Sequence, residues 1–519
     1  MAKDIHAQSV PLPKFPMSAF DMGYSLKLCS DIGRMNCHYV EEVIPGDIAH
    51  IKTDIFARLD PLTFPIMHKI KVRQNFFFVP TRLILGDALM EEFFSCKDLG
   101  AQIPYLVVPP LGTAPGDINF NPLSKNSLFD QMECQPPANN SVAREIPNPI
   151  PFYAYNKIWM DYYADEIYDA TEIANFQSIL DTYQATPLNG FQYVSANYAN
   201  PFTTRRVSYS KDRFTSAQPD AQRVGEVYLM NPLILERVDG SAMGSPGTIE
   251  VQSTGHVQKT STSTDLRASL TIDELWDEMA VQRFLNSLNE FGNERYVEIL
   301  AGQFGVISAD ARLQRAQWLG GNEMVVNISE VLQTSETTST SPQGNLSGRG
   351  IVSGRGRDIS FRVPEHGYVI GILTFVPENG YASGSPRWLF KRSPLDFAMP
   401  RFNNLGEQAV YNGELYSEHT GTSGNDYGEF GYQPQYDEYR SHVSRCTGDF
   451  RESQFLAWHL DRKFTSVPAL NSSFIHIDQA VNNRIFNDTD PNAHHLRVHC
   501  FHKSMYVRPI SRHPIPGKL

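Results

Sequence analysis

Three segments of the chain have the hydrophobic pattern of β-strands. Residues 66–79 alternate Ile70 and Val72 with charged neighbours and then become apolar on both faces, as in a strand that passes from a half-exposed into a buried environment. Residues 366–376 form an apolar run rich in β-forming side chains, and residues 495–508 alternate at their start. A proline ends each segment. We therefore predict strands near the beginning, in the middle and at the end of the chain.

Helical patterns are fewer. Residues 271–292 begin with a capping box and keep roughly helical apolar spacing until a glycine, which predicts one helix. A second candidate helix, 155–168, follows the proline-rich stretch 147–151, and a third spans 83–94. Strands spread along the chain with long connections between them predict a barrel or sandwich with large insertions and not a row of βαβ units.

Two stretches have the composition of exposed loops. Residues 238–265 are rich in Ser, Thr and Gly and lack aromatic side chains, and residues 333–357 contain Ser-Gly-Arg-Gly twice. The main-chain N–H groups of such a repeat can cradle a phosphate. A flexible surface turn explains the same residues more simply. We therefore predict that both stretches are loops.

Composition and charge narrow the class of protein. The 519 residues carry 45 Lys and Arg against 57 Asp and Glu, a formal net charge of −12, which does not suit a chain that binds nucleic acid alone through counterion release. A hydrophobic content of 41% is enough to build a core. No apolar run reaches the roughly 18 residues of a membrane span, and the N-terminus lacks a secretory pattern. The six scattered cysteines, which form no Cys-x-x-Cys pair, are predicted to be buried or incidental thiols.

Charge is separated along the C-terminal third of the chain. Residues 402–439 hold seven acids and no Lys or Arg, whereas residues 497–519 hold five bases and no acid. The acidic segment is either a solvated loop or the lining of a sugar-cleaving or calcium site. The basic segment, which also contains aromatic side chains, is either a solvated or subunit-facing tail or a surface for single-stranded nucleic acid. Its candidate DNA contacts are Lys503, Arg508, Arg512 and Lys518.

The densest group of metal-ligand side chains is His494, His495, His499, Cys500 and His502. Imidazole and thiolate groups can bind zinc, but in an extended strand Cys500 and His502 lie on one face while His495 and His499 lie on the other. We therefore predict locally satisfied or solvent-facing histidines and no zinc site. The sequence also lacks a phosphate-binding Gly-x-x-x-x-Gly-Lys-Ser/Thr motif and a Gly-x-Ser-x-Gly elbow, and we predict no active site.

Short strings of residues in a fixed order point to a known family. They are Phe20-Asp21, Glu42–Asp47, Phe76–Arg82, Pro151–Trp159, Phe304–Val306, Asp310–Arg315, Leu319–Gly321, Glu438–Arg440 and Leu470–Phe474. Together these strings resemble the major capsid protein of microviruses, the small single-stranded DNA phages, and in particular the gokushovirus-like branch. The resemblance covers about residues 20–510. It fails at Gln218 and Asp220, where the family usually has Leu and Trp, which indicates a divergent branch.

The resemblance implies a mainly β fold, namely an eight-stranded antiparallel jelly-roll barrel with long loop insertions that carry a few helices. It implies one domain over 1–519, used as a structural protein and not an enzyme. About sixty copies would form a T=1 icosahedral shell around a circular single-stranded DNA genome. The expected location is the virion, assembled in the cytoplasm of a host bacterium. No cofactor is expected, and a structural cation between subunits stays an open alternative.

The resemblance also implies partners and a host-facing insertion. The partners are further copies of the chain, the DNA genome, a small basic DNA-binding protein, a scaffolding protein and a receptor on the host surface. The insertion corresponds to residues 225–265, near the threefold axis. Its representative positions are Ser241, Gly244, Ser245 and Gly255.

Two other functions fit parts of the sequence. A jelly-roll protein that binds or cleaves carbohydrate would use the acidic 402–439 segment, with a pair of carboxylates in a cleft. A nucleic-acid-binding module would act through residues 497–519.

Overall fold

The computed structural model describes most of the chain in separate ranges. They are residues 16–94, 100–109, 123–137, 143–194, 200–220, 314–332, 346–403, 406–419, 425–488, 490 and 493–513, with four short strands between 235 and 268.

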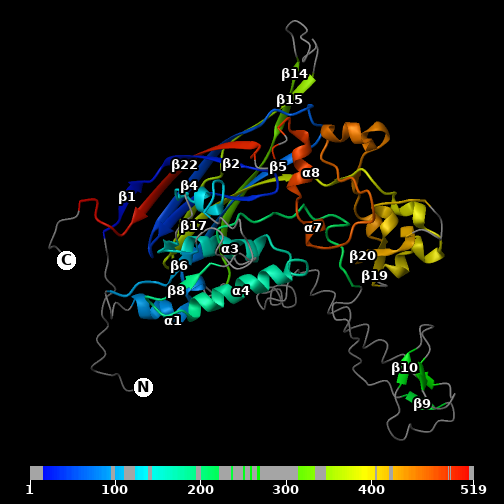
Figure 1. The fold of residues 1–519 in the computed structure, drawn as a ribbon, viewed down its shortest axis with the longest axis horizontal. Coiled ribbons are helices and arrows are strands. Elements are labelled where there is room, and N and C mark those ends of the chain that lie inside the picture. Colours follow the sequence, from blue (N-terminus) through cyan, green and yellow to red (C-terminus); the bar gives the residue numbers. More distant parts are fainter. Residues whose placement is uncertain are drawn as a thin grey trace.

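Two antiparallel sheets form the centre of the molecule (Figure 1). The larger sheet has the strand order β1-β22-β4-β15-β14, with β2 also paired to β22 and β16 also paired to β4. Its strands are β1 (Ser18–Asp21), β2 (Tyr24–Ser30), β4 (Ile48–Leu59), β14 (Asn327–Leu332), β15 (Leu346–Gly354), β16 (Ile359–Arg362) and β22 (Leu496–Arg508). The paired β14 and β15 project from the rest of the sheet at the top of Figure 1.

The smaller sheet has the order β13-β5-β17-β3. Its strands are β3 (Met35–Val43), β5 (Ile70–Pro80), β13 (Gln317–Val325) and β17 (Gly367–Pro377). The consecutive strands β3, β4 and β5 alternate between the two sheets, so the chain crosses the sandwich twice within its first 80 residues. Such crossings are typical of Greek-key sandwiches.

Helices cover one face of the smaller sheet (Figure 1). They are α1 (Arg82–Phe94), α3 (Ile150–Tyr162) and α4 (Ala170–Ala185). The prediction that α3 starts at residue 155 is wrong, because the helix begins five residues earlier and takes Pro151 into its first turn. The first turn tolerates proline because its N–H groups have no partner within the helix.

Short elements fill the connections. They are α2 (Leu128–Gln131), α7 (Ser472–Ile475), α8 (Gln479–Asn482), the β6 (Tyr105–Val108), β7 (Arg144–Ile146) and β8 (Phe191–Tyr193) sheet, the β18 (Gly380–Tyr381) and β21 (Ser444–Arg445) pair, and the β19 (Glu407–Tyr411) and β20 (Glu429–Pro434) pair.

The three predicted strands are confirmed, and burial explains their patterns. In β5, Phe76 and Phe78 pack in the sandwich with residues of β4, whereas the ring of Phe77 packs at a tilt against Tyr162 of α3, with ring centroids 4.8 Å apart. The strand is therefore apolar on both faces because a layer covers each face. In β22, alternate residues from Leu496 to Tyr506 are buried, as the two-residue period predicts.

One predicted loop is a strand. Residues 346–354 form β15, which pairs with both β14 and β4. A Cβ atom on Gly348 would lie 2.6 Å from the carbonyl oxygen of Phe64, and one on Gly350 would lie 2.9 Å from Leu59. The glycines of the repeat thus permit close packing of this strand and need not make a flexible turn.

The segment 225–265 is described only in part. Within it, β10 (Ile249–Val251) pairs with β11 (Val257–Lys259), and β9 (Leu235–Arg237) pairs with β12 (Leu266–Ala268), which lies just beyond it. The β10–β11 pair corrects the expectation that 238–265 is loop throughout. The exposure of this segment stays a prediction, and the helix expected over 271–292 lies outside the described residues.

The mainly β class with antiparallel sheets and inserted helices is confirmed. Across the described ranges the strand pairings do not close into a barrel, and the two main sheets hold seven and four strands. None of the helices in these ranges is long and apolar enough to cross a membrane.

Candidate functional site

The acidic segment 402–439 folds against basic side chains from other parts of the chain. Glu414, whose side chain is 1% exposed, accepts from Arg213 Nε at 3.0 Å and from Arg387 Nη1 at 3.1 Å. Glu414 ends a short 3-10 turn that follows β19, and its Oε1 also accepts the main-chain N–H of Tyr411 at 3.2 Å. Two guanidinium groups thus converge on one carboxylate in the protein interior.

Two further acids complete what we call the Glu414 cluster: Arg213, Arg387, Lys391, Glu414, Asp437 and Glu438. Arg213 Nη1 lies 3.1 Å from Asp437, and Lys391 Nζ lies 2.7 Å from Glu438. Burial raises the pKa of Glu438, but hydrogen bonds from Lys391 and Gln408 outweigh that effect and hold the pKa below its usual value. The charges are therefore used within the fold, which does not favour the carbohydrate alternative.

Glu407 is the exception in this segment. Burial raises its pKa to about 7, and its Oε2 atom is buried with no hydrogen-bond partner in the part of the chain that the structure describes. A single such carboxyl differs from the pair of carboxylates that sugar cleavage requires.

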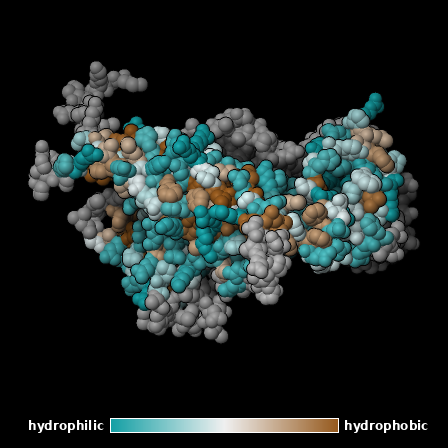
Figure 2. All heavy atoms as spheres, turned by 90° about the horizontal axis from the view of Figure 1, so that it is seen from above, coloured by the Kyte–Doolittle hydropathy of each residue, from teal (hydrophilic) through white to brown (hydrophobic). Residues whose placement is uncertain are grey.

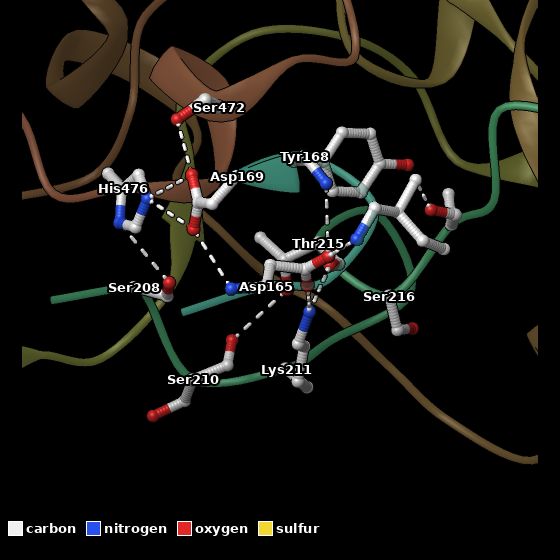
Figure 3. Close-up of polar contacts among 12 residues, drawn as sticks. Asp165, Tyr168, Asp169, Ser208, Ser210, Lys211, Thr215, Ser216, Ser472 and His476 are labelled. Atoms are coloured by element: carbon white, nitrogen blue, oxygen red, sulfur yellow. Dashed lines mark hydrogen bonds and ion pairs between the residues drawn. The ribbon is translucent and has the colours of Figure 1, made fainter. Parts of the chain in front are cut away.

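A second polar cluster joins three segments that are far apart in sequence (Figure 3). Asp169, at the start of α4, lies 2.8 and 2.9 Å from Nε2 of His476 and accepts from the Ser472 hydroxyl at 2.7 Å. Burial raises the pKa of Asp169, but its hydrogen bonds with His476, Asp165 and Ser472 and the charge of His476 hold it below the usual value.

The contact of Ser208 Oγ with His476 Nδ1 at 3.3 Å extends this cluster into a Ser-His-Asp chain. Ser208 and His476 are also opposite each other in an antiparallel β-bridge. Their contact is thus a cross-strand pair. Lys211 adds an ion pair to Asp165, so the cluster ties the 208–216 segment to the start of α4 and to α7.

Three of the four predicted DNA contacts have partners within the fold. Lys503 Nζ lies 2.7 Å from Asp54 on the neighbouring strand β4. Arg508 lies 2.9 Å from Glu41 and 3.2 Å from Asp47. Arg512 donates to the carbonyl of Ala19 at 3.1 Å. Lys518 lies outside the described residues, as do Ser241, Gly244, Ser245 and Gly255, so DNA and host contacts at these positions stay predictions.

The histidine-rich segment 494–502 does not form one cluster, as its strand pattern predicts: its side chains meet different partners on different sides. His494 and His495 lie 3.1 and 3.0 Å from the two carboxylate oxygens of Asp31. Burial raises the pKa of Asp31, but these hydrogen bonds outweigh it and lower the pKa.

Cys500 and His502 point to the buried side of β22, where they meet His38 of β3. A ligand atom from each of the three lies within 4.8 Å of the others. We call these three residues the His-Cys-His cluster. No local sequence pattern predicts this cluster, because more than 450 residues separate His38 from Cys500.

An apolar surface lies next to the Glu414 cluster. Five large side chains in twelve residues are exposed, from 39% for Met399 to 70% for Trp388. We call this set the 388–399 patch: Trp388, Leu389, Leu395, Phe397 and Met399. Lys391 lies within it, with its Nζ 5.8 Å from the centre of the Phe397 ring. Figure 2 shows hydrophobic groups at several places on one face of the molecule, among them the lobe that carries β19 and β20.

Comparisons with known proteins agree on one class. Residues 9–517 match the family model described as "Capsid protein (F protein)". The chain is 28% identical to "Capsid protein VP1" of Chlamydia phage 1 and 28% identical to that of Bdellovibrio phage phiMH2K, in each case over 98% of this chain and 96% of the relative. It is 24% identical to "Capsid protein VP1" of Spiroplasma virus 4 over 97% of this chain.

Proposed function

Because the chain belongs to the "Capsid protein (F protein)" family, it is a structural capsid protein and not an enzyme, and we propose that it forms the closed shell of a microvirus-like phage. About sixty copies make a T=1 icosahedral shell around circular single-stranded DNA. The observation that carries this proposal is the family match over nearly the whole chain, 9–517.

The arrangement of strands supports a jelly-roll origin for the core. The crossings between β3, β4 and β5 and the antiparallel pairing in both main sheets agree with that topology. The pairing of β1, β2 and β22 on the larger sheet adds strands beyond an eight-stranded barrel.

The 388–399 patch supports contact between copies. Monomeric proteins rarely expose many large apolar side chains together, and protein interfaces are rich in Trp, Phe and Met. We infer that neighbouring copies cover the patch in the shell. Each contact between two copies is only moderately strong, but closed symmetry repeats it many times, and the repeated contacts together stabilise the particle.

We propose the remaining partners from the family resemblance, with which the net charge of the chain agrees. A chain with a net charge of −12 neutralises little DNA, which agrees with the small basic protein that the resemblance places beside the genome. Lys503, Arg508, Arg512 and Lys518 supply local contacts. A scaffolding protein guides assembly in the cytoplasm of the host bacterium, and residues 225–265, with Ser241, Gly244, Ser245 and Gly255, meet the host receptor.

The particle mass tests this proposal. About sixty chains of 58.5 kDa give about 3.5 MDa of protein in each shell. Particles purified from infected cells and emptied of DNA should have that mass by charge-detection mass spectrometry, plus minor proteins. A discrete mass near 10 MDa, or small soluble oligomers alone, would contradict the T=1 shell.

A further inference from the structure

The His-Cys-His cluster is built by a defect in strand pairing. The register of β3 against β17 shifts between Gly371 and Ile372, which pair with Tyr39 and Cys37 and leave His38 as the extra residue of a β-bulge. Bulges re-aim side chains and are frequent beside functional sites. A Cβ on residue 371 would lie 2.8 Å from the His38 ring. The glycine thus leaves room for the imidazole.

The surroundings of the two imidazoles are those of metal ligands. His502 Nδ1 lies 2.8 Å from the hydroxyl of Thr53, and His38 Nε2 lies 3.5 Å from the amide of Gln74. The other ring nitrogens, His38 Nδ1 and His502 Nε2, are buried and have no hydrogen-bond partner within the described ranges. Metal-binding histidines have this arrangement, in which one nitrogen bonds the metal and a polar group orients the other.

We propose that the His-Cys-His cluster binds one thiophilic transition-metal ion, Zn²⁺ or Cu⁺, that links the two main sheets. The Cys500 sulfur and one nitrogen from each imidazole supply three ligands of a type that both ions accept. The ligand atoms now lie within 4.8 Å of one another, whereas ligands of a tetrahedral site are about 3.5 Å apart. Binding therefore draws the side chains inward by about 1 Å. The proposal departs from the sequence-based expectation of no cofactor.

All three residues of the cluster are buried, so we expect the metal to enter during folding. The Cys500 thiol loses its proton to solvent as the metal–sulfur bond forms.

A second group of potential ligands, Cys446, His459 and Asp461, is less suited to this role. His459 Nε2 contacts the carbonyl of Phe450 at 2.9 Å, and its Nδ1 lies 3.4 Å from Asp461. Both ring nitrogens of His459 are thus engaged. In the His-Cys-His cluster one nitrogen of each ring has no such partner.

The first test is the metal content of particles purified from infected cells, measured by inductively coupled plasma mass spectrometry after dialysis against a weak chelator. We expect about one Zn or Cu atom per capsid chain, and the element detected distinguishes the two ions. A content below about one-tenth of an atom per chain would overturn the proposal.

The second test locates the metal. The full-length chain is refolded with Co²⁺ as the probe, and we expect thiolate-to-cobalt charge-transfer absorption at about one ion per chain. Cys500→Ser should lose this absorption. Cys37→Ser is the matched control, because Cys37 is equally buried one residue from His38 and should keep it. Bound Co²⁺ without thiolate absorption, or equal absorption in Cys500→Ser, would contradict the assignment.

Discussion

Glu414→Gln is the most informative change in the Glu414 cluster. The substitution keeps the shape of the side chain but removes the charge that faces Arg213 and Arg387. These arginine side chains are 4% and 7% exposed, and that of Glu414 is 1% exposed. Removing one partner of a buried ion pair costs about 3–5 kcal/mol, since the other charge stays buried without compensation.

The structure places the expected cost at the lower end of that range. Arg213 keeps Asp437 at 3.1 Å and Glu438 at 3.8 Å, whereas Arg387 keeps the carbonyl of Ala409 at 2.9 Å. We expect a loss of about 3 kcal/mol in the free energy of unfolding, which raises the unfolded fraction by about 100-fold.

Urea unfolding of the full-length chain, followed by tryptophan fluorescence, measures this loss. Asp54→Asn is the control, because its partner Lys503 is 65% exposed and exposed pairs contribute at most about 1 kcal/mol. Glu414→Gln should lower the urea midpoint several times more than Asp54→Asn. Equal midpoints for the two variants would refute the conclusion that the acidic segment is used for internal pairing.

Three further predictions use the same unfolding measurement or an assembly assay. Burial raises the pKa of Glu407 to about 7, so the protonated side chain is tolerated below pH 4.5, and the charged form lowers the free energy of unfolding as pH rises through 7. Glu407→Gln should therefore stabilise the chain at pH 8 by about 1–2 kcal/mol and leave its stability unchanged at pH 4.5. Gly348→Ala should destabilise by about 2–3 kcal/mol, because the added Cβ meets main chain at 2.6 Å, and an unchanged midpoint would contradict that packing. Trp388→Ser should reduce the yield of closed particles without changing the unfolding free energy of the chain, whereas Met67→Ser, at a similarly exposed position of 69%, should leave the yield unchanged.

Local patterns were enough to predict the strands but not their partners. The two-residue alternation of β22 follows from burial on one face, and the apolar C-terminal end of β5 follows from burial on both faces. A short window of sequence is enough to show either pattern. The sequence alone does not place the start of α3 correctly, because a proline in the first turn resembles a proline that ends a helix.

The contacts that build the charged and metal-ligand clusters are long-range. Arg213 and Glu414 lie about 200 residues apart in sequence, and His38 meets Cys500 from the other end of the chain. The composition of residues 402–439 shows the acids, but the bases that pair with them lie elsewhere in the chain. The Ser-Gly-Arg-Gly repeat also depends on a long-range contact. Its Gly348 packs closely against Phe64, and the sequence alone does not distinguish this requirement for glycine from that of a turn.

A cryo-electron-microscopy reconstruction of DNA-filled particles from infected cells would show which polypeptide forms the shell and how many copies it holds. We expect a T=1 icosahedral shell in which each of about sixty equivalent positions holds one copy of this chain, with the 388–399 patch covered by a neighbouring copy. A shell with a different number of copies, or a particle in which another polypeptide forms the shell, would contradict it.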